Sequence, residues 1–196
     1  MNELKAYSSQ NFKNKISYLL SKLDSCSLLD LNYCLYFLDE ESIKTSGVPF
    51  TWQSYRVCEI GPICNNLHME FIEGIRFKNR GEALGLSGFI TCSGSRWKSK
   101  VSLSEMYEED PSEIEISYSD MELIDILSIT FNDNIRDNSW LFSLVGTLYH
   151  KYSQEQHILN QWEAMIGRSY SMINWIEYID TPAKKIAYKD SFMDML

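Results

Sequence analysis

The sequence predicts a mainly helical α+β fold: one compact domain of about six to eight helices with a small antiparallel β-hairpin. Apolar residues recur at helical spacing in several separate stretches of the 196-residue chain. Capping residues and glycines stand where these stretches begin and end. Because a chain of this length suits one domain, we assign residues 1–180 to a single helical domain and residues 181–196 to a C-terminal helix or tail.

Two amphipathic helices are predicted in the N-terminal part of the chain. Apolar residues from Phe12 to Leu23 share one face of the first helix, which ends at about residues 22–24. Ser27 opens the second helix, because Ser27 and Asp30 can form a capping box that satisfies N–H groups of the first turn. Gly47 ends this helix, since glycine enters the left-handed conformation without steric cost.

The next segment is predicted to be an irregular or extended connector, residues 49–59, which carries Trp52 and Tyr55. Gly61 and Pro62 mark a turn that follows it. Proline suits the first position of a helix, where its missing N–H would have no partner in any case. A third helix is therefore predicted to begin at this turn and to end at about Lys78.

The β-hairpin is predicted over about residues 85–103, where glycines punctuate a β-rich run, and the acidic residues of about 104–116 follow as an exposed loop. Ser119 and Glu122 form a second capping box, which opens a strongly apolar helix through Phe131. Further helical stretches are predicted at residues 140–150, 158–166 and 170–179, and the last segment begins at Pro182.

The charge and the composition favour a protein partner in the cytoplasm. The formal net charge is −9 and the pI is about 4.8, so the charge opposes general binding to nucleic-acid phosphates and suits a basic protein surface better. The chain opens without the apolar stretch of a signal peptide, and no apolar run is long enough for a membrane span. Five cysteines, an odd number, suit reduced thiols rather than a disulfide framework.

We find no motif that predicts an enzyme, a metal centre or a cofactor. The glycine-rich run lacks the Lys-Ser/Thr of a phosphate loop. Cys58, Cys64, His68 and Cys92 are the best candidates for zinc, but their spacing is too wide for the close pairs of a structural zinc site. The three histidines fit no nucleophile signature. A hydrolase or a metal enzyme with an unfamiliar arrangement remains an alternative.

Asp39 is the most informative single residue. It follows Tyr36 and Phe37 on the predicted second helix, and a carboxylate beside a buried aromatic run must be solvated or paired. Asp39 can hydrogen-bond either the hydroxyl group of Tyr55 or the backbone near Gly61. Either bond would fix the connector against the helix.

Residues 31–66 resemble the Panacea domain, the SocA-like antitoxin family. The run Leu35-Tyr36-Phe37-x-Asp39, then Gly47, Tyr55 and Gly61-Pro62, follows the order and spacing of the family's motifs. Tyr33 stands where the family commonly has lysine, and Ile60 where it often has an aromatic residue. The helix that begins at Ser119, with His150 and Trp162 as a later pair, resembles a second family element.

This resemblance implies a protein that neutralises a toxin encoded next to it, through protein contacts and without catalysis. A second interpretation is an adaptor or sensor in phage or defence biology that delivers a client to a protease. The partner would then be a protease or a phage protein, and a homo-oligomer is a further alternative. The residues assigned to the family motif or to partner binding are Tyr36, Phe37, Asp39, Trp52, Tyr55, Gly61, Pro62, His150 and Trp162.

Overall fold

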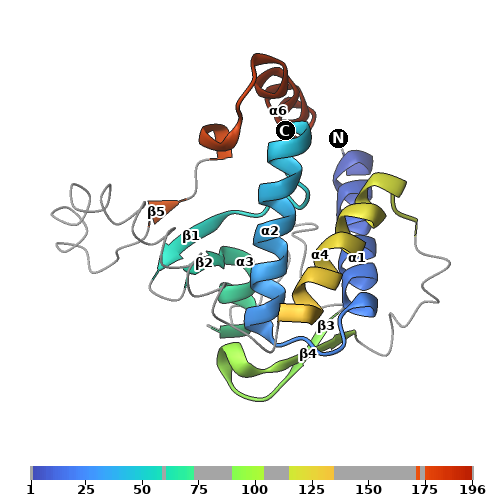
Figure 1. Cartoon of the computed structure of the whole chain (residues 1–196), viewed down its shortest axis with the longest axis vertical. Helices are drawn as coiled ribbons and strands as arrows, with labels where there is room; N and C mark the ends of the chain where they lie inside the picture. The colour runs from blue at the N-terminus through green and yellow to red at the C-terminus, as the bar shows by residue number, and fades with distance from the viewer. Residues whose placement is uncertain are drawn as a thin grey trace, which may run out of the picture.

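The computed structural model describes residues 2–58, 61–72, 90–103, 115–134, 171–172 and 175–195. In these residues the fold is mainly helical with two small antiparallel sheets, as the sequence predicts for its class. Three long helices lie side by side: α1 (Asn2–Lys22), α2 (Leu28–Ser46) and α4 (Tyr118–Asn134) (Figure 1). A three-stranded sheet lies on the side of α2 that faces away from α4. Helix α6 (Pro182–Met195) crosses the C-terminal end of α2.

The ends of α2 form as their sequence predicts. Ser27 is the N-cap, and its hydroxyl group accepts a hydrogen bond of 3.2 Å from the backbone N–H of Asp30. The side chain of Asp30 accepts one of 2.9 Å from the backbone N–H of Ser27, which completes the capping box. Gly47 ends the helix in the left-handed conformation, with φ +82°.

The connector leads into an antiparallel sheet in which β1 (Tyr55–Cys58) lies between β2 (Gly61–Cys64) and β5 (Ser171–Met172). The prediction that Pro62 begins a helix is wrong, because Pro62 pairs with Val57 within β2. β2 is the outer strand of this sheet in the described residues, and an outer strand tolerates a residue without an N–H.

The helix predicted after Pro62 begins three residues later than expected. It consists of α3 (Asn65–Leu67) and a π-helical turn, His68–Ile72. The remainder of that predicted helix, residues 73–78, lies outside the described residues.

The predicted hairpin is confirmed over its described part. β3 (Ile90–Ser93) pairs with β4 (Lys100–Leu103), and the turn between them contains Gly94 and a 3-10 helix, Arg96–Lys98. The link between α1 and α2 runs along the other edge of β4. Two backbone hydrogen bonds of 2.8 Å hold it there. The N–H of Val101 donates to the carbonyl of Cys26, and the N–H of Leu28 donates to the carbonyl of Ser99. The hairpin is thereby attached to the start of α2.

Helix α4 begins two residues earlier than the predicted capping box implies, and its cap is Ser117 rather than Ser119. The hydroxyl group of Ser117 accepts a hydrogen bond of 3.1 Å from the backbone N–H of Asp120. The backbone carbonyl of Ser117 accepts another, of 3.0 Å, from the N–H of Met121. The residues buried against the neighbouring helices share one face of α4: Ile124, Ser128 and Phe131.

The prediction of one continuous helix over residues 170–179 is wrong. Residues 171–172 form β5, which pairs with β1, and Trp175–Tyr178 is a 3-10 helix. Five α-helices occupy the described residues, fewer than the six to eight predicted. The helices predicted at residues 140–150 and 158–166, and most of the predicted acidic loop, lie outside the described residues.

The core is centred on α2, which buries residues around most of its circumference. Its fully buried side chains include Leu31, Leu35, Tyr36 and Leu38. The cysteines whose side chains are described are free thiols: Cys26, Cys34, Cys64 and Cys92. Among the described helices, none is long and apolar enough to span a membrane.

Candidate functional site

The Asp39 carboxylate lies at the centre of a buried polar cluster. It is fully buried on α2 and accepts hydrogen bonds from the backbone N–H of Thr51, from the Thr51 hydroxyl group and from the Tyr55 hydroxyl group. The Tyr55 bond measures 2.7 Å and confirms the first of the two predicted partners. The backbone donor is Thr51, not a residue near Gly61. The cluster holds the connector against α2.

The electrostatics of the cluster place Asp39 under two opposing influences. Burial raises the pKa of Asp39 from 3.8 to about 6, although hydrogen bonds from Thr51 and Tyr55 and the charge of Lys15 act in the opposite direction. Burial also raises the pKa of Tyr55 well above its usual value. The ammonium group of Lys15 donates a hydrogen bond of 3.0 Å to the carbonyl of Phe50 and lies 3.2 Å from a carboxylate oxygen of Asp120. Lys15 therefore connects α1, α4 and the connector.

Asn32 anchors the sheet to α2, and sequence reasoning missed it. Its Nδ2 donates a hydrogen bond of 2.7 Å to the carbonyl of Pro62. Its Oδ1 accepts a hydrogen bond of 2.7 Å from the backbone N–H of Cys64. Asn32 is fully buried, so neither bond competes with water. An asparagine inside the otherwise apolar stretch Leu31–Leu38 was the available signal, because a buried amide must find partners.

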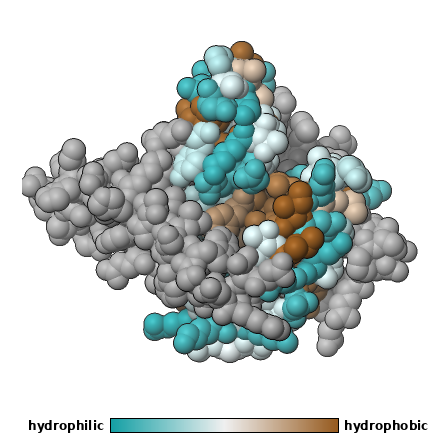
Figure 2. Space-filling view, in the orientation of Figure 1, coloured by the Kyte–Doolittle hydropathy of each residue, from teal (hydrophilic) through white to brown (hydrophobic). Residues whose placement is uncertain are grey.

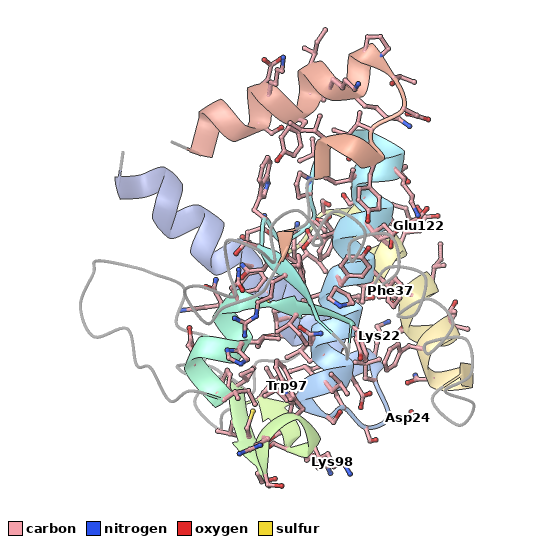
Figure 3. The ribbon with its side chains drawn as sticks, turned by 90° about the vertical axis from the view of Figure 1, so that its left-hand side faces the viewer. Lys22, Asp24, Phe37, Trp97, Lys98 and Glu122 are labelled. Carbon is pink, nitrogen blue, oxygen red and sulfur yellow. The ribbon has the colours of Figure 1, made fainter. Side chains whose placement is uncertain are left out.

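The aromatic residues of the resemblance pack into the interior. Tyr36 is fully buried, and its ring meets the ring of Tyr55 edge-on at a centroid distance of 5.6 Å. Its hydroxyl oxygen lies 3.4 Å from that of Tyr178. Phe37 is half-buried and packs edge-on against Tyr36 at 5.4 Å (Figure 3). Tyr36 and Tyr55 thus belong to the core and are not open to a partner.

Trp52 belongs to a separate contact between the connector and α6. It is half-buried, has a φ of +57°, and lies 5.4 Å from the ring of Tyr188. Nearby, the ammonium group of Lys184 donates to the carbonyl of Lys44 and to the carboxylate of Asp180. A Cβ atom on Gly47 would collide with the backbone carbonyl of Lys184. Helix α6 is therefore closely packed on the end of α2 rather than a free tail.

Three of the four residues considered for zinc, Cys64, His68 and Cys92, belong to no metal-binding group within the described residues, and the side chain of Cys58 lies outside them. Those residues contain no group of three or more His, Cys, Asp or Glu side chains placed to hold a metal ion. Cys64 is fully buried, and its Sγ lies 3.6 Å from Oε1 of Gln53. Burial raises the pKa of Cys64 to about 12 and that of Cys92 to about 11, so both thiols stay protonated at neutral pH.

The outward face of α4 is the most exposed apolar surface on a described helix. Tyr118, Ile126 and Ile129 are 82%, 60% and 63% exposed. Glu122 lies exposed between them in the sequence (labelled in Figure 3). In the orientation of Figure 1, apolar residues also reach the surface where α2 and α4 meet (Figure 2). The sequence signal was that seven of the eleven residues 121–131 are apolar and are spread around the helix, although only one face of it can be core.

The residues of the resemblance are therefore divided between three places. Tyr36, Asp39 and Tyr55 come together in the interior, Pro62 is buried beside Asn32, and Trp52 lies under α6. Gly61 opens β2 opposite Cys58. His150 and Trp162 lie outside the described residues. No protein-family model, curated protein sequence or solved structure matches this chain.

Proposed function

We propose that this chain is a non-catalytic, antitoxin-like protein of the cytoplasm that binds and neutralises a toxin encoded next to it. The observation that carries the proposal is the outward face of α4, where three large apolar side chains are 60% or more exposed. Large apolar residues that are grouped on a surface mark binding sites more often than residues scattered singly. Aromatic and aliphatic anchors of this kind supply most of the free energy of a protein interface.

The charge of the chain supports a basic partner. α4 has the sequence Tyr-Ser-Asp-Met-Glu-Leu-Ile-Asp-Ile-Leu-Ser-Ile-Thr-Phe-Asn-Asp-Asn, which contains four acidic residues and no lysine or arginine. With a net charge of −9, the whole chain attracts a basic protein and increases its rate of association. Toxins that act on RNA need a basic surface, and an acidic protein can cover it.

In this proposal, the buried polar residues Asp39, Tyr55 and Asn32 act as a scaffold. Asp39 and Tyr55 hold the connector, and Asn32 holds β2, against the same helix that packs beside α4. Their substitution would weaken binding only through the stability of the fold. Substitutions on α4 would weaken binding while the fold stays intact.

The proposal is tested by expressing the neighbouring gene product with and without this chain. We expect the neighbour to arrest growth alone, and the two proteins to purify as a stoichiometric complex when growth is rescued. The complex should weaken as salt increases, because screening reduces attraction between opposite charges. A neighbour that is harmless alone, or that is not recovered with this chain, would contradict the antitoxin assignment.

The second candidate is an adaptor that delivers a client to a protease, which requires two binding surfaces. The position at which we would test for the second surface is Ile186, which is 60% exposed on α6, away from the packed contacts of Trp52 and Gly47. Deleting the whole segment would also remove those contacts, so we would change Ile186→Glu alone. If the chain is an adaptor, this variant binds its client normally and no longer promotes its degradation.

A further inference from the structure

Four exposed residues of α4 form one continuous stripe, which the exposed residues Ser119 and Thr130 border on one side. At about 100° per residue, positions 118, 122, 126 and 129 fall within an arc of about 80°. The buried residues Ile124, Ser128 and Phe131 lie on the opposite side of the helix. The stripe therefore points directly away from the core, and its residues are Tyr118, Glu122, Ile126 and Ile129.

The dimensions of the stripe suit another helix. Eleven residues separate its ends, which corresponds to about 16 Å or three helical turns. The backbone groups of α4 are satisfied within the helix, so an extended peptide placed on it would find no backbone partners and would leave its own N–H and C=O groups unpaired. A helix brings its own hydrogen bonds and can pack apolar side chains between Tyr118, Ile126 and Ile129.

The charges around the stripe select a basic helix. Asp120 and Asp125 are already compensated by α1, because Asp120 lies 3.2 Å from Lys15 and Asp125 lies 2.9 Å from Lys22. Glu122 is exposed within the stripe itself, where a lysine or arginine of a partner would meet it. An acidic partner would instead meet Glu122 and a chain with a net charge of −9.

We propose that the outward stripe of α4 binds a basic amphipathic helix of the partner protein, with apolar residues at i, i+4 and i+7 and lysine or arginine beside them. This inference rests on the proposed function, because it identifies the surface and the partner chemistry of the same binding event. The partner helix packs its apolar face on Tyr118, Ile126 and Ile129, and one of its cations pairs with Glu122.

The first test uses synthetic peptides and does not require the natural partner. One peptide of about 15 residues has leucine at i, i+4 and i+7 with lysine elsewhere. A second has glutamate in place of lysine, and a third has the lysine peptide's composition without an apolar face. We expect the first peptide to bind at least about tenfold more tightly than the others, and to slow amide hydrogen exchange in residues 118–129. Equal binding of the lysine and glutamate peptides, or protection elsewhere only, would overturn the inference.

Matched variants locate the binding face. Ile126→Arg places a positive charge in the stripe and should lower the affinity for the lysine peptide by about tenfold or more. Ile186→Arg is the control, because Ile186 is also 60% exposed but lies on α6. It should bind like the wild type. Glu122→Lys should weaken binding and reduce its dependence on salt.

Three further outcomes would contradict the inference. A lower unfolding temperature of free Ile126→Arg would mean that this chain itself covers the stripe. If the wild type sediments as a dimer and Ile126→Arg sediments as a monomer, the occupant of the stripe is a second copy of this chain. If Ile126→Arg no longer binds the peptide but still rescues growth from the neighbouring toxin, the antitoxin proposal stands and the α4 inference fails. If the wild type does not rescue growth although the peptide binds to α4, the antitoxin proposal fails alone.

Discussion

Asn32 and Asp39 lie seven residues apart on α2, and each holds a different part of the chain that returns along this helix. The side chain of Asn32 bonds to Pro62 and to Cys64, whereas that of Asp39 bonds to Thr51 and Tyr55. Seven residues are about two helical turns, so the two side chains leave the same face. The connector and the first two strands are thus attached to α2 at both ends.

Asn32→Ala should lower the free energy of unfolding by about 2–4 kcal/mol, because it leaves a buried carbonyl and a buried N–H without partners. Asn132→Ala is the matched control. Asn132 also bonds a carbonyl and an N–H, at Lys22 and Asp24, but at an exposed site where water can replace it. We expect the control to lose less than about 1 kcal/mol. Urea unfolding curves measure both, and equal losses would show that burial of Asn32 is unimportant.

Asp39 should make stability depend on pH in the acidic range. Its pKa is raised from 3.8 to about 6 by burial, so the folded protein holds this proton more tightly than the unfolded chain. Its contribution to stability is then fully present below about pH 3.8 and is lost as the pH rises to about 6. Asp39→Asn, which cannot ionise, should lose less stability than the wild type across this window. Parallel urea titrations over the window test this, and identical pH profiles would be evidence against a raised pKa.

The caps of α4 give a direct comparison of two serines. Ser117→Ala should lower the free energy of unfolding by about 1 kcal/mol, since it removes the acceptor for the N–H of Asp120. Ser119→Ala should have a smaller effect, because the Ser119 hydroxyl is exposed and its hydrogen bond is to the Ser117 hydroxyl. Thermal unfolding of the two variants checks the assignment. A larger loss for Ser119→Ala would restore the cap predicted from the sequence.

Gly47→Ala should destabilise the protein for two reasons that can be separated. The left-handed conformation costs an alanine about 1–2 kcal/mol, and the new Cβ would collide with the carbonyl of Lys184. We would repeat the substitution in a chain shortened before Pro182, where only the first effect remains. The loss should be larger in the full chain than in the shortened chain. Equal losses would mean that α6 does not approach Gly47 in solution.

Local signals allowed the sequence to predict one part of this fold. Ser27, Asp30 and Gly47 define the ends of α2 because a cap depends only on residues within a few positions of it. Asp39 was identified because a carboxylate in an apolar run requires partners, and Tyr55 was within reach along the chain.

The errors occurred where a distant segment decides the local structure. Pro62 would suit a helix start, but pairing with Val57 and the hydrogen bond from Asn32 place it in a strand. Residues 171–172 follow a helical pattern, yet they pair with β1, more than 110 residues earlier in the chain. The outward stripe of α4 was not predicted because periodicity shows which positions are apolar but not which of them the neighbouring helices cover.

The packing of the C-terminal residues on α2 has a consequence for synthesis. The Tyr36–Tyr178 contact closes over 142 residues, and the bond from Lys184 to Lys44 closes over 140. A ribosome that adds about 5–20 residues each second needs about 7–28 s to translate that distance, whereas an isolated helix forms within microseconds. The C-terminal end of α2 is therefore synthesised several seconds before the residues that cover it. During that time a chaperone can reach this surface before α6 does.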